Sequence, residues 1–192
     1  MRRRSLRLVA GLAVATALVG GCSSKHEAND TLPSASETSA SPSLEPLGPA
    51  DLPMPAGARK QSAAGAEAFI RYYFDILNRS LTDLDPRYIR QFADSCEDCE
   101  RIAQETEQDA AAGYSYKGGE LVIAGKISVA IQSPGRAESA FIVDQAALTI
   151  LDANGQPVPN LTFEAKPGLS SGTLALWDDS TSSWKMSVLT LG

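Results

Sequence analysis

The chain has 192 residues, which suits one ordinary domain or two very small ones. Its 43% hydrophobic content is typical of a packed core and excludes a wholly disordered protein. The 23 acidic residues outnumber the 17 basic ones, for a net charge of −6. This balance argues against nucleic-acid binding, because neutralising phosphates requires clustered Lys and Arg. The single histidine, His26, excludes a His-rich metal site and a Ser-His-Asp triad in the folded part.

Residues 1–21 have the layout of an export signal, with four arginines followed by an apolar run from Leu8 to Val19. The run is too short for a membrane-spanning helix, which needs about 20 apolar residues. It ends in small residues followed by Cys22, a pattern that resembles the lipobox of bacterial lipoproteins. The resemblance implies cleavage before Cys22 and lipidation of its thiol. The alternative is an ordinary signal peptide with a chance cysteine.

Cleavage would remove four basic residues and no acidic ones, leaving 13 basic and 23 acidic residues. Anionic lipid headgroups repel such a chain. We therefore expect it to be held at the extracytoplasmic face of the cell membrane by acyl chains on Cys22, since two chains give the stable attachment that one lacks.

Residues 22–60 are predicted to be a disordered tether. They are rich in Ser, Pro, Ala, Thr and Glu, contain no aromatic residue and show no helical or alternating period. Such a composition cannot bury enough apolar surface to offset the entropy of ordering. A domain is predicted to follow at 61–192.

Three helices are expected at the start of this domain. Residues 64–77 place apolar side chains at helical spacing, and residues 78–80 look like a frayed end. Asp85-Pro86 favours the start of a short second helix. A third helix is expected at about 96–112, with Ser95 as its cap and Gly113 as its stop.

Period-two patterns dominate the rest of the chain and predict five or six strands. The strand candidates, separated by turn signals such as Pro134-Gly135 and a loop at Pro167-Gly168, are 120–124, 126–133, 138–151, 160–166, 172–177 and 184–191. Helices first and strands afterwards predict an α+β fold, with three helices packed on one face of a curved antiparallel sheet.

The run from Phe69 to Asn78, with Tyr72-Tyr73-Phe74-Asp75 at its centre, resembles an uncharacterised family of actinobacterial lipoproteins. That family continues with a Cys-x-x-Cys like that of Cys96 and Cys99, a Gly-Gly before the strands and a strand-rich end with Trp. The resemblance covers roughly residues 50–192. It implies the cone-shaped fold of nuclear transport factor 2 and its relatives. The family has no assigned activity, so the resemblance implies no catalytic residue.

Cys96 and Cys99 form the sharpest chemical feature of the domain. Residues three apart on a helical turn are close enough for a disulfide, and export places them in an oxidising compartment. We expect a structural disulfide that pins the second helix to the third. A redox pair is the alternative, although Glu97 and Asp98 oppose thiolate formation. A metal site would need two further ligands, which the domain's cysteines and histidines do not supply.

Cone-shaped folds can enclose a pocket between sheet and helices, and some relatives are isomerases or dehydratases, which need an acid or base inside. The candidates for lining such a pocket are Tyr72, Tyr73, Asp75 and Asp144. The alternative interpretation is that the tyrosines belong to the core and that Asp144 is an exposed strand residue between buried neighbours.

Trp177 and Trp184 flank a predicted turn, and we interpret them as a cross-strand pair, with a sugar-stacking surface as the alternative. No catalytic constellation and no cofactor or metal motif is evident. The sequence therefore predicts a non-enzymatic binding or scaffolding domain for an unidentified protein, lipid or glycan. The alternative is a small-ligand carrier or isomerase-type enzyme that uses a cone pocket.

Overall fold

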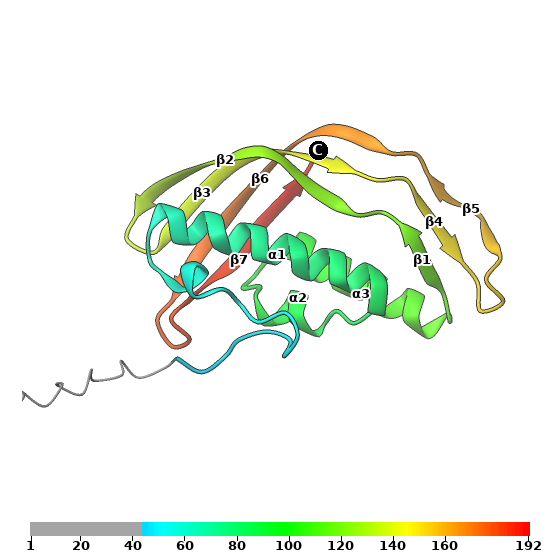
Figure 1. Cartoon of the computed structure of the whole chain (residues 1–192), viewed down its shortest axis with the longest axis horizontal. Helices are drawn as coiled ribbons and strands as arrows, with labels where there is room; N and C mark the ends of the chain where they lie inside the picture. The colour runs from blue at the N-terminus through cyan, green and yellow to red at the C-terminus, as the bar shows by residue number, and fades with distance from the viewer. Residues whose placement is uncertain (1–43) are drawn as a thin grey trace, which may run out of the picture. The chain divides into compact units, whose positions relative to one another are not determined.

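The computed structural model describes residues 44–192, which form one compact unit (Figure 1). The lipobox, Cys22 and most of the predicted tether lie outside the described residues. The helices within them are a short 3-10 turn η1 (Ala56–Arg59), α1 (Ala63–Asp83), α2 (Arg87–Gln91) and α3 (Glu97–Ala111).

Seven strands follow the helices. They are β1 (Ser115–Gly118), β2 (Leu121–Ser133), β3 (Arg136–Gln145), β4 (Leu148–Leu151), β5 (Pro157–Phe163), β6 (Lys166–Asp178) and β7 (Ser183–Leu191). All paired strands are antiparallel, in a four-stranded sheet of order β2-β3-β6-β7 and a three-stranded sheet of order β1-β4-β5. The α+β class with three leading helices is thus confirmed, whereas a single sheet of five or six strands is not what forms.

The two sheets arise because three long stretches of chain bend side by side. β1 turns into β2 at Gly119-Glu120, β3 into β4 at Ala146-Ala147, and β5 into β6 at residues 164–165. The predicted single strand 138–151 is therefore two strands. At the bend, the N–H of Gly119 donates to Ala147 O over 3.0 Å. A Cβ at Gly118 would lie 2.1 Å from that same oxygen, so the close crossing of the backbones requires glycine.

Helix α1 lies across one face of the four-stranded sheet and supplies more buried hydrophobic residues than any other element (Figure 1). It is longer than predicted, because Ser80 beyond the expected end is still buried and Leu84 closes the helix through its N–H bond to Ser80 O. Asn78 is not a frayed residue: its side chain exchanges two hydrogen bonds with the backbone of Leu121, at 2.9 and 2.8 Å.

Residues 44–60 belong to the domain, so the predicted boundary at residue 61 is wrong. Met54 and Ala58 are buried, and the backbone closes on itself through the bond from Met54 N to Leu47 O. The sequence of this segment suggests disorder because it has no periodic pattern. The segment is nevertheless ordered, because it packs over α1 without forming a long helix or strand.

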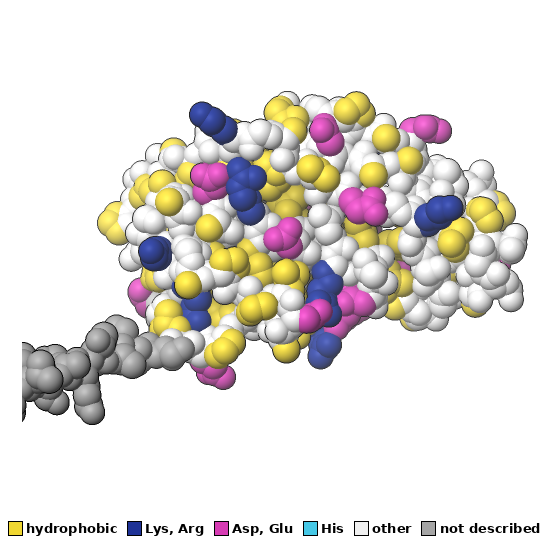
Figure 2. All heavy atoms as spheres, in the orientation of Figure 1, with side chains coloured by type: hydrophobic (Ala, Val, Ile, Leu, Met, Phe, Trp, Pro, Cys, Tyr) yellow, Lys and Arg dark blue, Asp and Glu magenta, His cyan; other side chains and the backbone are white. Residues whose placement is uncertain are grey.

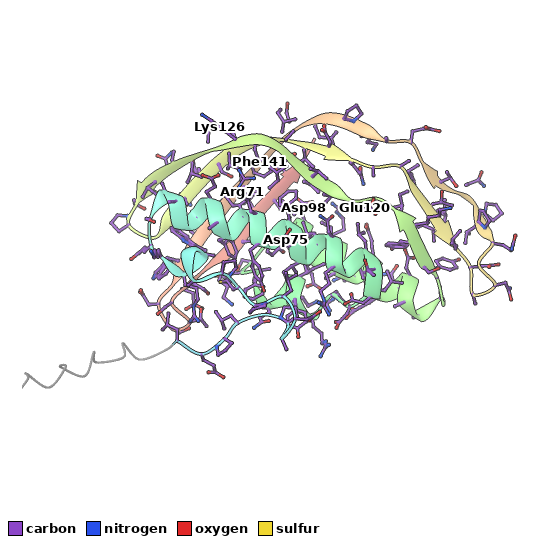
Figure 3. The ribbon with its side chains drawn as sticks, in the orientation of Figure 1. Arg71, Asp75, Asp98, Glu120, Lys126 and Phe141 are labelled. Atoms are coloured by element: carbon purple, nitrogen blue, oxygen red, sulfur yellow. A yellow bond between two sulfur atoms is a disulfide. The ribbon has the colours of Figure 1, made fainter. Side chains whose placement is uncertain are left out.

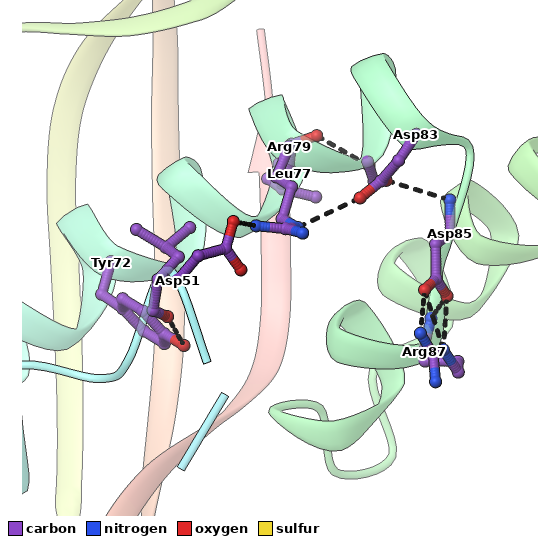
Figure 4. A network of polar contacts seen from close by, with 9 residues as sticks. Asp51, Tyr72, Leu77, Arg79, Asp83, Asp85 and Arg87 are labelled. Atoms are coloured by element: carbon purple, nitrogen blue, oxygen red, sulfur yellow. Dashed lines mark hydrogen bonds and ion pairs between the residues drawn. The ribbon is translucent and has the colours of Figure 1, made fainter. Parts of the chain in front are cut away.

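Side chains of the domain fasten this segment at several points. Tyr72 donates its hydroxyl to Leu52 O over 3.1 Å, and the indole N–H of Trp184 donates to Lys60 O over 3.0 Å. Arg79 forms an ion pair with Asp51 and a second with Asp83 (Figure 4). Hydrogen bonding by Arg79 lowers the pKa of the Asp51 carboxyl. Since Asp51 is exposed, this pair adds little stability, and the buried contacts hold the segment.

Two further details differ from the sequence expectations. Cys96, and not Ser95, is the N-cap of α3, and Ser95 takes a left-handed φ of 54°. Pro167-Gly168 is not a loop but lies within β6, where the N–H of Gly168 donates to Asp144 at 2.7 Å. Trp177 and Trp184 do pair across β6 and β7, with their rings edge to face at 5.4 Å.

The boundary is tested by comparing the stability of residues 44–192 with that of residues 61–192. Removing 44–60 deprives Tyr72 and Trp184 of their acceptors and exposes core surface, so we expect a loss of at least about 3 kcal/mol. Urea unfolding followed by tryptophan fluorescence measures it. Equal stability of the two chains would mean that the segment is a passive tether after all.

Candidate functional site

The two tyrosines predicted for a pocket belong to the core. Tyr72 and Tyr73 are buried in the middle of α1, and the hydroxyl of Tyr73 donates to Ile89 O over 3.3 Å. Tyr72 donates in the same way to Leu52 O, so both phenol hydroxyls are hydrogen-bonded to backbone carbonyls. Burial raises the pKa of each phenol far above neutral pH, so both stay protonated. They hold the fold together and are not free for chemistry.

The two predicted carboxylates do not join the tyrosines. Asp75 is an exposed residue of α1 (labelled in Figure 3), although partial burial of its carboxyl raises its pKa. Asp144 is exposed on β3, just before the bend and on the face opposite to that of the buried Phe141 and Val143. Its carboxylate accepts the N–H of Gly168. The four residues therefore do not line one pocket, and Asp144 has a structural role in β6.

A different hollow lies beside the bend of the sheets. It has a volume of about 200 Å³ and lies between the C-terminal half of α1, the middle of α3 and the strands on either side of the bend. Its lining is mainly apolar, with leucines at its centre. The residues are Leu77, Ser80, Leu81, Ile102, Glu105, Thr106, Tyr116, Gly119, Leu121, Gln145, Leu148 and Leu191.

The polar groups of this hollow are largely engaged elsewhere. Ser80 and Thr106 donate their hydroxyls to carbonyls of their own helices, at 2.7 and 2.8 Å. Tyr116 donates to Asp109, and burial together with that carboxylate raises the pKa of the phenol. Glu105 is exposed and paired with Arg101. The hollow can therefore take a small apolar group, but it presents no poised acid or base.

Sequence patterns contained a partial signal for this hollow. The adjacent Gly118 and Gly119 mark a sharp change of chain direction, and the predicted strand 138–151 contains Ala146-Ala147, a pair of low strand propensity. The pattern of one strand cannot show that the bends of three separate chain stretches lie side by side. That alignment creates the space, and it depends on the register of strands far apart in the chain.

Cys96 and Cys99 form a disulfide at the start of α3. Both residues are buried, and the sulfur of Cys96 accepts the N–H of Cys99 as an N-cap. The bond closes the first turn of α3 and does not reach α2, so it does not pin the two helices together. Arg90 of α2 links the two helices instead, through ion pairs with Glu100 and Glu107 of α3. Its hydrogen bonds lower the pKa of both carboxyls.

An open groove of about 700 Å³ runs along the start of α3. Two of its basic groups are engaged in ion pairs, since Arg90 pairs with Glu100 and Arg101 with Asp98. Within residues 44–192, no group of three His, Cys, Asp or Glu is placed to hold a metal ion. Basic residues are scattered among acidic ones on the face shown in Figure 2.

The role of the disulfide is tested with two double variants. Cys96→Ser/Cys99→Ala removes the bond but keeps a capping oxygen, and we expect a loss of about 2 kcal/mol for so short a loop. Cys96→Ala/Cys99→Ala also removes the cap and should cost about 1 kcal/mol more. Thermal and urea unfolding measure both. A wild-type bond that mild reductants open in the native protein would instead favour the redox interpretation.

No helix within residues 44–192 is both long enough and apolar enough to cross a bilayer. The sequence matches no protein-family profile and no curated protein.

Solved structures resemble the domain. The intermembrane space region of the chloroplast protein ARC6 aligns with a TM-score of 0.52 and 14% identity, covering 69% of this chain and 97% of that one. Aln2 from a Streptomyces species aligns with a TM-score of 0.43 and 9% identity, over 69% of this chain and 93% of its own. An uncharacterized Caulobacter vibrioides protein with a cystatin-like fold aligns with a TM-score of 0.40 and 15% identity, over 68% and 87%. The likeness to ARC6 shows a shared α+β fold and, at this identity, the fold alone.

Proposed function

We propose that the protein is a lipid-anchored, extracytoplasmic binding protein without catalytic activity, of the actinobacterial lipoprotein family that its sequence resembles. The observation that carries the proposal is the filled interior. The space beneath the sheet is occupied by aromatic side chains of α1, and both of its phenols are tied to backbone carbonyls. An isomerase or dehydratase needs an acid or base beside its substrate. Asp75 and Asp144, the expected carboxylates, face outward.

Anchoring through Cys22 is supported by three features of the chain. The first is the lipobox, and the second is the acidic balance, which leaves no basic patch to hold an anionic membrane. The third is the buried disulfide of Cys96 and Cys99, which suits an oxidising compartment outside the cytoplasm. A lipidated cysteine followed by a polar segment would place the domain beside the membrane surface.

The hollow beside the bend is the best candidate for the bound ligand. Its volume of about 200 Å³ is smaller than the usual 300–1,000 Å³ of drug-sized sites. It corresponds to the liquid volume of about seven water molecules at about 30 Å³ each. Leucines from α1, β2, β4 and β7 line it, so an uncharged, largely apolar ligand such as a small ring system fits it best. Tyr116, with its pKa raised, is a poor proton donor at neutral pH.

Anchoring is tested by producing the full chain in an actinobacterial or other bacterial host with labelled palmitate. The wild type is expected in the membrane fraction with the label, and Cys22→Ala without it. Cys96→Ala/Cys99→Ala serves as the control, because it also loses cysteines but should keep the label. A Cys22→Ala chain that remained lipidated and membrane-bound would contradict the proposal.

Ligand binding is tested with indole as an uncharged apolar probe, followed by amide chemical shifts. We expect shifts that cluster at the residues lining the hollow. Leu81→Trp, which fills the hollow, should weaken indole binding at least about tenfold, or 1.4 kcal/mol. Leu44→Trp makes the same exchange at an exposed site away from the hollow and should not. Equal binding by both variants, or shifts elsewhere, would place the ligand outside the hollow.

A further inference from the structure

Gln145 differs in its hydrogen bonding from the other polar residues that line the hollow beside the bend. The hydroxyls of Ser80, Thr106 and Tyr116 donate their hydrogens to other groups of the protein. Glu105, a carboxylate in an ion pair, has no hydrogen to donate. The side-chain amide of Gln145 lines the same hollow, and within residues 44–192 it is hydrogen-bonded to no other residue.

The alternation of β3 places Gln145 on the inner face of the sheet. Phe141 and Val143 are buried on that face, and the residues between and after them are exposed. Successive side chains of a strand point to opposite faces, so Gln145 follows Phe141 and Val143 inward. It is the half-buried last residue of β3, at the point where the sheet bends (Figure 1). Leu121, its partner on β2, lines the hollow beside it.

Gln145 is the lining side chain that still has hydrogens to donate. A primary amide carries two N–H donors, whereas a hydroxyl has one hydrogen. The backbone N–H groups of Gly119 and Leu121, two other lining residues, are already bonded to Ala147 O and to the Asn78 side chain. A ligand atom that accepts a hydrogen bond would therefore find its partner in the Gln145 amide.

The charges around the hollow indicate that this ligand atom is uncharged. No lining side chain is basic, and Glu105 is one of the lining residues. Asp109 adds a second acidic group, because it accepts the hydroxyl of Tyr116. A carboxylate ligand would lose its water without gaining a counter-charge and would meet like charges. A ring nitrogen, an ether oxygen or a carbonyl oxygen carries no such cost.

We propose that Gln145 gives the hollow its specificity, by donating a hydrogen bond to the acceptor atom of an uncharged, otherwise apolar ring compound. This inference rests on the proposed binding of an apolar ligand in the hollow and names the polar group that such a ligand carries. An acceptor that enters an apolar site loses its bonds to water, and the loss is costly unless the protein replaces them. Gln145 supplies the replacement, and the leucines of the lining contact the remainder of the ring.

The test compares quinoline with naphthalene, two fused-ring compounds of the same shape that differ by one ring nitrogen in place of a C–H. Residues 23–192 are used, because they keep the whole compact unit and omit the proposed anchor, so that no detergent micelle competes for the probes. Amide chemical shifts, followed during titration at slightly alkaline pH where quinoline is uncharged, give both the location and the dissociation constant. We expect both probes to shift the residues that line the hollow.

Gln145→Leu removes the donor, so it should weaken quinoline relative to naphthalene at least about fivefold, or about 1 kcal/mol. Gln145→Glu keeps the shape of the side chain but also removes the donor, and should change the ratio of the two dissociation constants in the same direction. Gln156→Leu is the matched control, because it makes the same exchange at an exposed glutamine outside the hollow and should leave the ratio unchanged. The amide spectra of the unliganded variants verify that each is folded.

Three outcomes contradict the inference, and they are distinguishable. If both probes bind in the hollow and the ratio is the same in the wild type and in both Gln145 variants, the hollow is a binding site but Gln145 does not select its ligand. An equal change of the ratio in Gln156→Leu would likewise remove the role of Gln145. If neither probe shifts the residues that line the hollow, the proposed binding itself is wrong and the role of Gln145 falls with it.

Discussion

The structure depends on the enclosure of a single helix. α1 is apolar around most of its circumference, with ten of its residues buried, and a helix of that kind is stable only when it is covered on several sides. The sheet covers one side, α2 and α3 another, and residues 44–60 a third. The aromatic contacts follow this plan: Phe74 meets Phe141 of β3, and Tyr72 meets Phe92 after α2, both edge to face.

The same enclosure decides where a ligand can and cannot go. Since aromatic side chains fill the space under the long sheet, the apolar hollow lies where the sheet bends away from the end of α1. The bend is imposed by backbones that cross at Gly118 and Ala147. The hollow is thus a by-product of sheet geometry, and its apolar lining follows from the leucines that the bent strands direct inward. The hydroxyls of Ser80, Thr106 and Tyr116 in its lining are bonded to neighbouring groups of the protein.

Much of this fold could be predicted from local patterns in the sequence. The three helices, the turn at Pro134-Gly135, the Trp177–Trp184 pair and the disulfide all depend on neighbouring residues or on short spacings. The extent of α1 and the order of residues 44–60 could not, because they depend on partners distant in sequence. The fate of Tyr72 illustrates the limit: its place on the helix is predictable, but its acceptor, Leu52 O, lies in a segment without any pattern.

The two hydrogen bonds between the Asn78 side chain and the backbone of Leu121 have a consequence for aggregation of the protein. β2 is an outer strand, and unpaired backbone groups on such a strand invite other chains to extend the sheet. The Asn78 side chain bonds both the N–H and the C=O of Leu121, as a neighbouring strand would. Arg71, earlier on α1, donates to Gly125 O further along β2. The three-stranded sheet has an edge at β5, where Pro157 and Pro159 lack the N–H that a new strand would need. Fibril-like growth is thereby discouraged along β2 and along β5.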